Sequence, residues 1–246
     1  LKPAQTPTNP SKIDIKAGKG LQFITDKNLY NELIRYFTKT FPSHAGVLNQ
    51  KFKWDDSKSV ATGSNPYLAV AVDMFLRSQK SRHRIATQRD LETNVQMFNG
   101  LYEDTGLALR SIAEPNKLQA ENLYNQIKKA NPSIEYPIFV ELRGLDLDPG
   151  LNFKLTPQSA YKKADCLNWE NGTHFSQKDD YGLPKSEDKS SSRQIWTSNA
   201  GLVRAYLFRG LGFSVCDDGL PNSGEYGRVV LVSAEGSAGG IMENKK

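Results

Sequence analysis

Apolar residues recur at helical spacing in the first half of the chain. Leu29, Leu33 and Phe37 follow one another every four residues after Asp26, a residue type that caps helices. This pattern predicts a helix over 26–41, which ends before Pro42. Asn65-Pro66 is a typical cap and first turn, so a second helix is expected over 67–78.

Two further helices are predicted before residue 130. Thr87 can cap a helix that places Leu91, Val95 and Phe98 on one face. Pro115 opens the other helix, which runs to Lys129 and should point Leu118, Leu123 and Ile127 inward. The apolar face of each helix needs a partner layer, so both are expected to pack on a core.

Short runs of strand formers dominate the second half. Strands are predicted at Pro137–Leu145, at Phe153 and Leu155, at Gln194–Thr197, and at Gly227–Ala234, the last as a buried strand. Asn168–Ser192 is a polar stretch too long for a simple connection, and it indicates a functional loop or insertion. Helices followed by short strands and long loops favour the α+β class.

Composition narrows the picture without changing it. With 246 residues, 38% of them hydrophobic and 24% charged, the chain has room for a substantial core. We expect a loose arm over 1–20, a single α+β domain over 21–235 that is helix-rich to about 135, and a polar tail over 236–246. No apolar run approaches the roughly 18 residues of a membrane helix, so membrane insertion is not expected. No signal peptide is visible, which favours a cytoplasmic or virion-associated protein.

The common signatures of catalysis are missing from the sequence. There is no phosphate-binding glycine loop, no dinucleotide fingerprint and no nucleophile elbow. The three histidines lie far apart, and a calcium loop starting at Asp146 would need a carboxylate where Pro157 stands. Cys166 and Cys216 are expected to be free thiols. We therefore expect no enzymatic activity, no metal and no cofactor.

Residues 201–230 show an unusual interleaving of two kinds of position. Leu207, Leu211 and Phe213 form a plausible framework face, because alternate residues of an extended chain share one side. Between and after them stand chemically miscellaneous residues, which are Tyr206, Phe208, Gly210, Gly212, Ser214, Val215, Cys216, Asp217, Pro221, Asn222, Gly224, Glu225 and Tyr226. A fixed scaffold with variable side chains is the simplest description of this segment.

This segment resembles the variable proteins of diversity-generating retroelements, in the group associated with archaea and their viruses. The resemblance rests on Gly201-Leu202, Arg204, the leucine and phenylalanine spacing above, Asp218, Leu220, Ser223 and the closing 227–230. Upstream, 86–91, 102–107 and 137–147 are also similar to that family. The similarity covers most of the chain beyond residue 60.

The resemblance implies a C-type-lectin-like fold whose C-terminal region is rewritten by a reverse transcriptase at template adenines. An asparagine codon altered in this way can yield twelve of the thirteen residues given above, and Glu225 is the exception. The thirteen positions are thus the expected ligand-binding residues, and the ligand is a partner specific to this variant, expected to be a protein. Leu207, Leu211, Leu220, Val229 and Val230 should be buried, while a contiguous exposed patch is expected at Tyr206, Phe208, Ser214, Val215, Pro221, Asn222, Gly224 and Tyr226.

Three other interpretations remain open at the level of sequence. Residues 206–226 could be an ordinary strand–loop–strand, since such loops are common. The chain could be a cysteine-dependent enzyme of lectin-like fold, or it could bind nucleic acid through the basic cluster Lys80–Arg84. The net charge of +5 is modest, and the cluster Lys80–Arg84 contains no phenylalanine, tyrosine or tryptophan on which a base could stack. Nucleic acid is therefore the less favoured partner.

Overall fold

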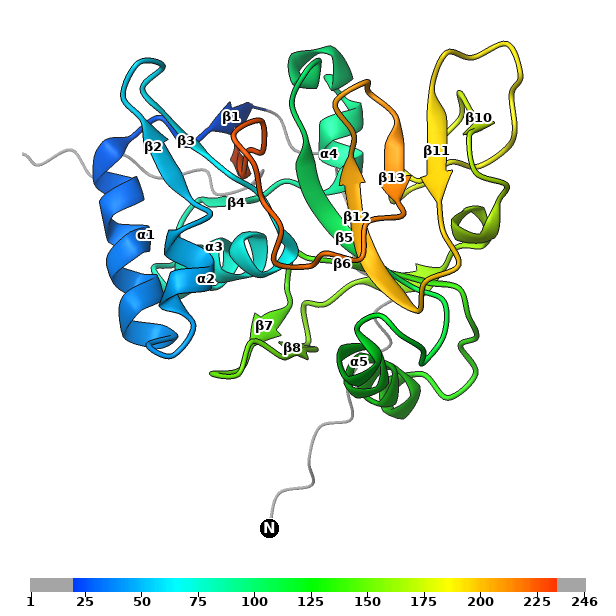
Figure 1. Ribbon diagram of the computed structural model, residues 1–246, viewed down its shortest axis with the longest axis horizontal. Helices are drawn as coiled ribbons and strands as arrows, with labels where there is room; N and C mark the ends of the chain where they lie inside the picture. Colours follow the sequence, from blue (N-terminus) through cyan, green and yellow to red (C-terminus); the bar gives the residue numbers. More distant parts are fainter. Residues whose placement is uncertain (1–19, 234–246) are drawn as a thin grey trace, which may run out of the picture.

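The computed structural model describes residues 20–233, and the expected arm up to residue 19 and the expected tail lie outside this range. Its helices are α1 (Lys27–Thr40), α2 (Ala45–Asn49), α3 (Pro66–Ser78), α4 (Gln88–Glu92) and α5 (Lys117–Ala130), with short 3-10 turns at Val95–Phe98 and Asp165–Asn168 (Figure 1). The predicted caps are confirmed for α1 and α3. The side chain of Asp26 accepts a hydrogen bond from the Asn28 amide, and that of Asn65 accepts one from the Leu68 amide.

A seven-stranded sheet forms the centre of the fold. Its order is β10 (Thr173–His174), β11 (Gln194–Thr197), β13 (Phe213–Val215), β12 (Leu202–Leu207), β5 (Glu103–Leu109), β6 (Ile138–Glu141) and β9 (Tyr161–Lys163). All neighbouring strands are antiparallel except β11 and β13, which are parallel. The combination of helices with mostly antiparallel strands agrees with the α+β class.

Smaller sheets flank the central one. β14 (Val230–Ser233) lies between β1 (Leu21–Phe23) and β4 (His83–Ile85), so the two ends of the described chain pair with each other. Two hairpins complete the set, namely β2 (Lys53–Asp55) with β3 (Val60–Thr62), and β7 (Asp146–Leu147) with β8 (Phe153–Lys154). The predicted strands at 138, 153, 194 and 230 are thereby confirmed.

Three apolar clusters hold these layers together. The largest joins α1, α3 and α5 to β5 and β6, and α3 is buried almost all round, as its continuous apolar run requires. A second cluster lies under the polar insertion, which contributes Phe175 and Leu183 to it. The third joins α4 to β14 through Leu91, Val230 and Val232. Within residues 20–233, no helix combines the length and the apolar character that crossing a bilayer requires.

The structure corrects several local predictions. Leu118 was expected to point inward, but its side chain is 81% exposed because α5 begins only at Lys117 and packs through Ala120, Leu123 and Ile127. The helix predicted after Thr87 stops at Glu92, and Val95 and Phe98 belong to a separate 3-10 turn. A capping box between Thr87 and Asp90 still fixes the start of α4.

The expected framework face along 207–213 is also interrupted. Leu207 packs in the third cluster, whereas Phe213 packs in the second. The pairing register shifts between Ala205 and Tyr206, and Leu211 lies in the turn between β12 and β13 with a φ of 63° and only partial burial. Simple alternation fails because a bulge and a turn lie within this segment. Leu207, Leu220, Val229 and Val230 are buried as predicted.

Burial gives opposite expectations for two leucines. Leu207→Ala should lower the free energy of unfolding by about 2–5 kcal/mol, because it leaves a cavity beside Val230. Leu118→Ala is the matched control and should change it by less than about 0.5 kcal/mol. Urea unfolding curves measure both values, and a Leu207→Ala protein as stable as Leu118→Ala would contradict the packing of β12.

Candidate binding site

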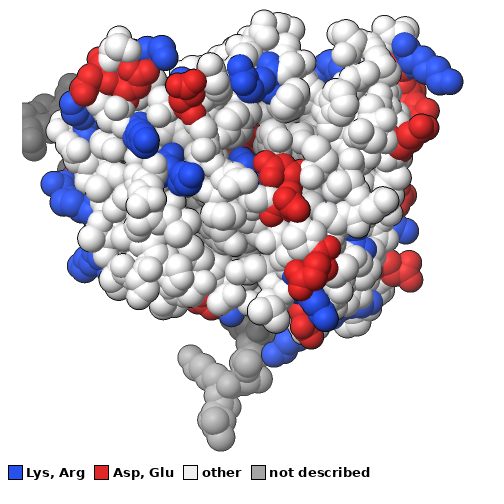
Figure 2. Space-filling view, in the orientation of Figure 1, with Lys and Arg blue, Asp and Glu red and all other residues white. Residues whose placement is uncertain are grey.

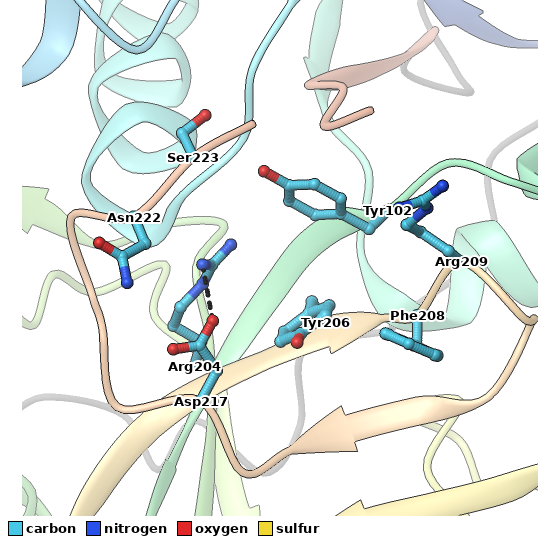
Figure 3. A pocket seen from close by; sticks show the side chains of 8 residues that line it. All are labelled: Tyr102, Arg204, Tyr206, Phe208, Arg209, Asp217, Asn222 and Ser223. Atoms are coloured by element: carbon cyan, nitrogen blue, oxygen red, sulfur yellow. Dashed lines mark hydrogen bonds and ion pairs between the residues drawn. The ribbon is translucent and has the colours of Figure 1, made fainter. Parts of the chain in front are cut away.

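A cavity of about 250 Å³ opens where β12 meets the loop that follows β13. β12 and the turn after it supply Arg204, Tyr206, Phe208 and Arg209, and the loop supplies Asp217, Asn222 and Ser223. Tyr102, which directly precedes β5, closes the remaining side (Figure 3). The cavity thus combines three aromatic rings with two arginines and one carboxylate.

Arg204 is the buried charge at the floor of this cavity. Its Nε and Nη2 atoms each donate to the carboxylate of Asp104 at 2.7 Å, which is a bidentate pair. Its Nη1 atom donates to Asp217 at 3.1 Å, the contact dashed in Figure 3. Burial alone would lower the pKa of Arg204, but the attraction of Asp104 and Asp217 outweighs burial and raises it. Arg204 therefore stays charged, and most of its donors are already in use.

Aromatic rings stand over and beside this guanidinium. It lies 5.0 Å from the ring centre of Tyr206 and 5.6 Å from that of Tyr102, both within the range of a cation–π contact. The ring centres of Tyr206 and Phe208 lie 6.4 Å apart, so Phe208 extends the aromatic surface towards the turn. There the guanidinium of Arg209 stacks on Tyr226 at 3.8 Å. The result is an aromatic surface with a fixed cation at its floor and an exposed one at its rim.

The loop over 217–226 is held mainly by framework contacts. The amide of Gly224 donates to the hydroxyl of Tyr102 at 2.6 Å, and Ser223 Oγ accepts from the Ser64 amide at 2.9 Å. Asn65 donates to the carbonyl of Pro221. All three contacts use either a backbone atom of the loop or the hydroxyl of Ser223. The other side chains of the loop are therefore not needed to hold it, and four of these residues are exposed, namely Pro221, Asn222, Glu225 and Tyr226.

The thirteen predicted binding residues divide into three groups. Exposed positions are Phe208, Gly210, Cys216, Pro221, Asn222, Gly224, Glu225 and Tyr226, and half-buried positions are Tyr206 and Asp217. Four of the ten line the cavity, namely Tyr206, Phe208, Asp217 and Asn222. Gly212, Ser214 and Val215 are buried, so the expected exposure of Ser214 and Val215 is wrong. These three residues lie in or beside β13, which has paired neighbours on both sides.

The two glycines of the turn differ in the room around them. A Cβ added to Gly210 would meet only the Phe208 ring, at 3.9 Å. A Cβ on Gly212 would come within 2.7 Å of the Gln194 carbonyl oxygen, so the neighbouring backbone would have to move. Gly224 resembles Gly210, with its nearest contact at 3.7 Å. The geometry therefore admits side chains at 210 and 224 and excludes them at 212.

Some cavity residues were not predicted as binding residues. Arg204 and Ser223 were assigned to the framework, and Tyr102 and Arg209 had no assigned role. Tyr102 lies about a hundred positions upstream, and only the fold brings it to the site. Trp196 on β11 is a further exposed aromatic residue, 36% accessible, whose strand partner is Ser214. The candidate binding surface thus extends beyond 201–230, which no pattern within that segment could show.

The residues of the alternative interpretations lie in unlike surroundings. Burial raises the pKa of the Cys166 thiol to about 12, so it is a poor source of thiolate at neutral pH, while Cys216 is exposed and free. Arg84 of the basic cluster holds the carboxylate of Asp90 in a bidentate pair. On the face shown in Figure 2, charged side chains of both signs stand in small groups. Between residues 20 and 233, no three histidine, cysteine or acidic side chains group as metal ligands would.

Comparison with protein-family models, with curated proteins and with solved structures finds no match to this chain.

The glycine geometry gives a direct test of which positions tolerate variation. Gly210→Ala should change the free energy of unfolding by less than about 0.5 kcal/mol, because the added methyl group meets open space. Gly212→Ala should cost about 1–3 kcal/mol, because the methyl group overlaps the Gln194 carbonyl. Thermal unfolding of the two variants side by side checks this, and equal stabilities would mean that 212 is as open as 210.

Proposed function

We propose that this chain is a ligand-binding display protein, whose surface around residues 206–226 is diversified by a retroelement reverse transcriptase. It binds a partner, most simply a protein, and catalyses no reaction. The main observation behind the proposal is that different atoms of the 217–226 loop hold it in place and face solvent. Its backbone is anchored by Tyr102, Ser64 and Asn65, while most of its side chains face outward.

The architecture supports a C-type-lectin-like scaffold for this display. Its strands are short, its polar insertion packs back onto the second apolar cluster, and its last described strand is buried between two others. The family resemblance implies the same three features. A fold class alone does not establish a function, so the proposed binding also depends on the chemistry of the exposed residues.

The composition of the exposed surface suits protein recognition. Phe208 and Tyr226 are 37% and 43% exposed, which is unusual for large aromatic residues on an ordinary surface. Tyrosine and phenylalanine give rigid contact area at low entropic cost, and asparagine and glycine give adaptable hydrogen bonding, as in antibody loops. Binding energy should therefore concentrate on Tyr206, Phe208 and Tyr226, with Arg209 at the rim.

Diversification predicts a specific arrangement of the flanking DNA. A reverse transcriptase gene and a near-identical repeat of the codons for 201–230 should lie nearby, and the repeat should carry adenines at the varied codons. The repeat should differ at the codons of the exposed residues Phe208 and Asn222 and of the half-buried Tyr206. It should agree at the codons of Leu207 and Gly212, where the structure admits no exchange. Genomic sequencing checks this, and the absence of any such repeat would remove the diversification half of the proposal.

The proposed binding of a partner can be tested separately, with a protein of known structure as the probe. A yeast-displayed library of this chain, randomised at 206, 208, 210, 222, 225 and 226, should yield folded clones that bind hen egg lysozyme after selection. A matched library randomised at six exposed positions of α1, namely Lys27, Asn28, Asn31, Glu32, Arg35 and Lys39, offers the same diversity on a helix surface. We expect binders from the first library at least tenfold more often. Equal yields from the two libraries would show that the 206–226 surface has no special capacity for recognition.

A further inference from the structure

A second cavity, of about 340 Å³, lies away from the display surface, beside the C-terminal half of α3 and the turn that follows β6. Three arginines line it, namely Arg77, Arg84 and Arg143. Asp73 is the only acidic side chain among its lining residues, and Pro157 and Gln158 form part of the opposite wall. Three guanidinium groups around one small cavity are a strong concentration of positive charge.

Two of these arginines are fixed by carboxylates outside or at the edge of the cavity. Arg77 donates to Asp73 at 2.9 Å and to Asp146 at 2.7 Å, and it also donates to the Leu145 carbonyl. The Nη1 and Nη2 atoms of Arg84 donate to the two carboxylate oxygens of Asp90. These contacts orient the two side chains and offset much of their charge.

Arg143 differs from the other two. No described side chain or backbone group accepts a hydrogen bond from it, although its side chain is only 19% exposed. Its nearest acidic neighbour is Glu141, with 3.8 Å between Nε and Oε2, which is beyond hydrogen-bond distance. A guanidinium carries five N–H donors, and no nitrogen of Arg143 is among the buried polar atoms without a partner, so its donors are open to the cavity. An acceptor from outside the described chain would complete its surroundings.

Glu141 does not fill that need. It is fully buried, and neither of its carboxylate oxygens has a hydrogen-bond partner among the described residues. Burial raises the pKa of Glu141 to about 7, although the nearby charge of Arg143 lowers it in part. Near pH 7 only part of Glu141 is therefore charged, so its ion pair with Arg143 compensates that guanidinium only in part.

The backbone that carries Arg143 is rigidly held. The Gly144 amide donates to Asp73 at 2.9 Å, and the Gly144 carbonyl accepts from Thr156 at 2.6 Å and from Ser159 at 2.8 Å. Gly144 has a φ of 79°, and a Cβ there would lie 2.5 Å from the Gln158 carbonyl oxygen. The turn is thus fixed before any ligand arrives, which reduces the entropic cost of binding.

We propose that this cavity binds a small oxyanion, a phosphate group or a carboxylate, with Arg143 as its principal donor and the already paired Arg77 and Arg84 as part of its wall. The planar fork of a guanidinium matches the oxygens of either group in a bidentate geometry. The site shares no lining residue with the 206–226 cavity, so the proposal is independent of the proposed display function.

Calorimetric titration of the whole chain with inorganic phosphate, and separately with malonate, tests the proposal at constant ionic strength. We expect saturable binding of at least one of the two, and the preferred probe identifies the oxyanion. Arg143→Gln should weaken binding at least about tenfold, the equivalent of one charged hydrogen bond. The control Arg35→Gln removes the same charge from the exposed face of α1 and should leave the affinity within about twofold.

A second variant separates binding from general charge effects. At pH 8, Glu141→Gln removes a negative charge 3.8 Å from Arg143 and should tighten binding of the preferred probe. Unfolding midpoints close to wild type for both variants would show that the fold is intact, and Arg143 has no described hydrogen bond to lose. Binding of neither probe, equal weakening by Arg143→Gln and Arg35→Gln, or unchanged or weaker binding by Glu141→Gln would each overturn the proposal.

Discussion

The buried pair of Arg204 and Asp104 is the interaction on which the proposed display surface depends. It joins the two central strands β12 and β5, and the same guanidinium reaches the Ser64 carbonyl and the Asp217 carboxylate. Asp104 in turn accepts a hydrogen bond from the Ser64 hydroxyl at 2.8 Å. Loss of one partner of such a buried pair typically costs about 3–5 kcal/mol, because the other charge is left without compensation. The positions of β12, of the segment before α3 and of the loop after β13 are thereby set by one network.

That network would let the proposed variable surface change while the protein stays folded. The anchors of the 217–226 loop are residues outside it, chiefly Tyr102, Ser64 and Asn65, so most exposed side chains of the loop contribute little to its position. Two less exposed loop residues are exceptions, since the hydroxyl of Ser223 accepts from the Ser64 amide and the carboxylate of Asp217 accepts from the Gly219 amide at 2.8 Å. Exchange at 217 would still leave Arg204 its bidentate partner Asp104. The structure therefore tolerates change there at a smaller cost than at either member of the buried pair.

Sequence patterns predicted the parts of the fold that local chemistry decides. Asp26, Asn65 and Thr87 are caps whose effect reaches only a few residues, and each begins a helix where expected. The central strand β5 was not predicted, because Glu103, Asp104 and Thr105 are typical of a loop unless distant partners bury them. Those partners lie far away in the chain, in Ser64, Arg204 and Val230. The exposure of Ser214 and Val215 was mispredicted for a related reason, since only the pairing of β13 with both β11 and β12 buries them.

The same contrast between local and distant contacts shapes recognition at the proposed display surface. The floor of its cavity, made by Arg204 and Tyr102, is tied to the fold and cannot change without loss of stability. The rim, with Phe208, Asn222 and Tyr226, is not tied in this way. A set of proteins varied at the rim would share an aromatic floor with a charge-compensated guanidinium and differ in the shape and polarity of the entrance. Such a floor favours a partner that inserts an aromatic or other flat apolar group, because the rings provide stacking area, whereas Asp104 and Asp217 already compensate the charge of Arg204. The rim would then decide which of the partners carrying such a group can approach closely enough to use it.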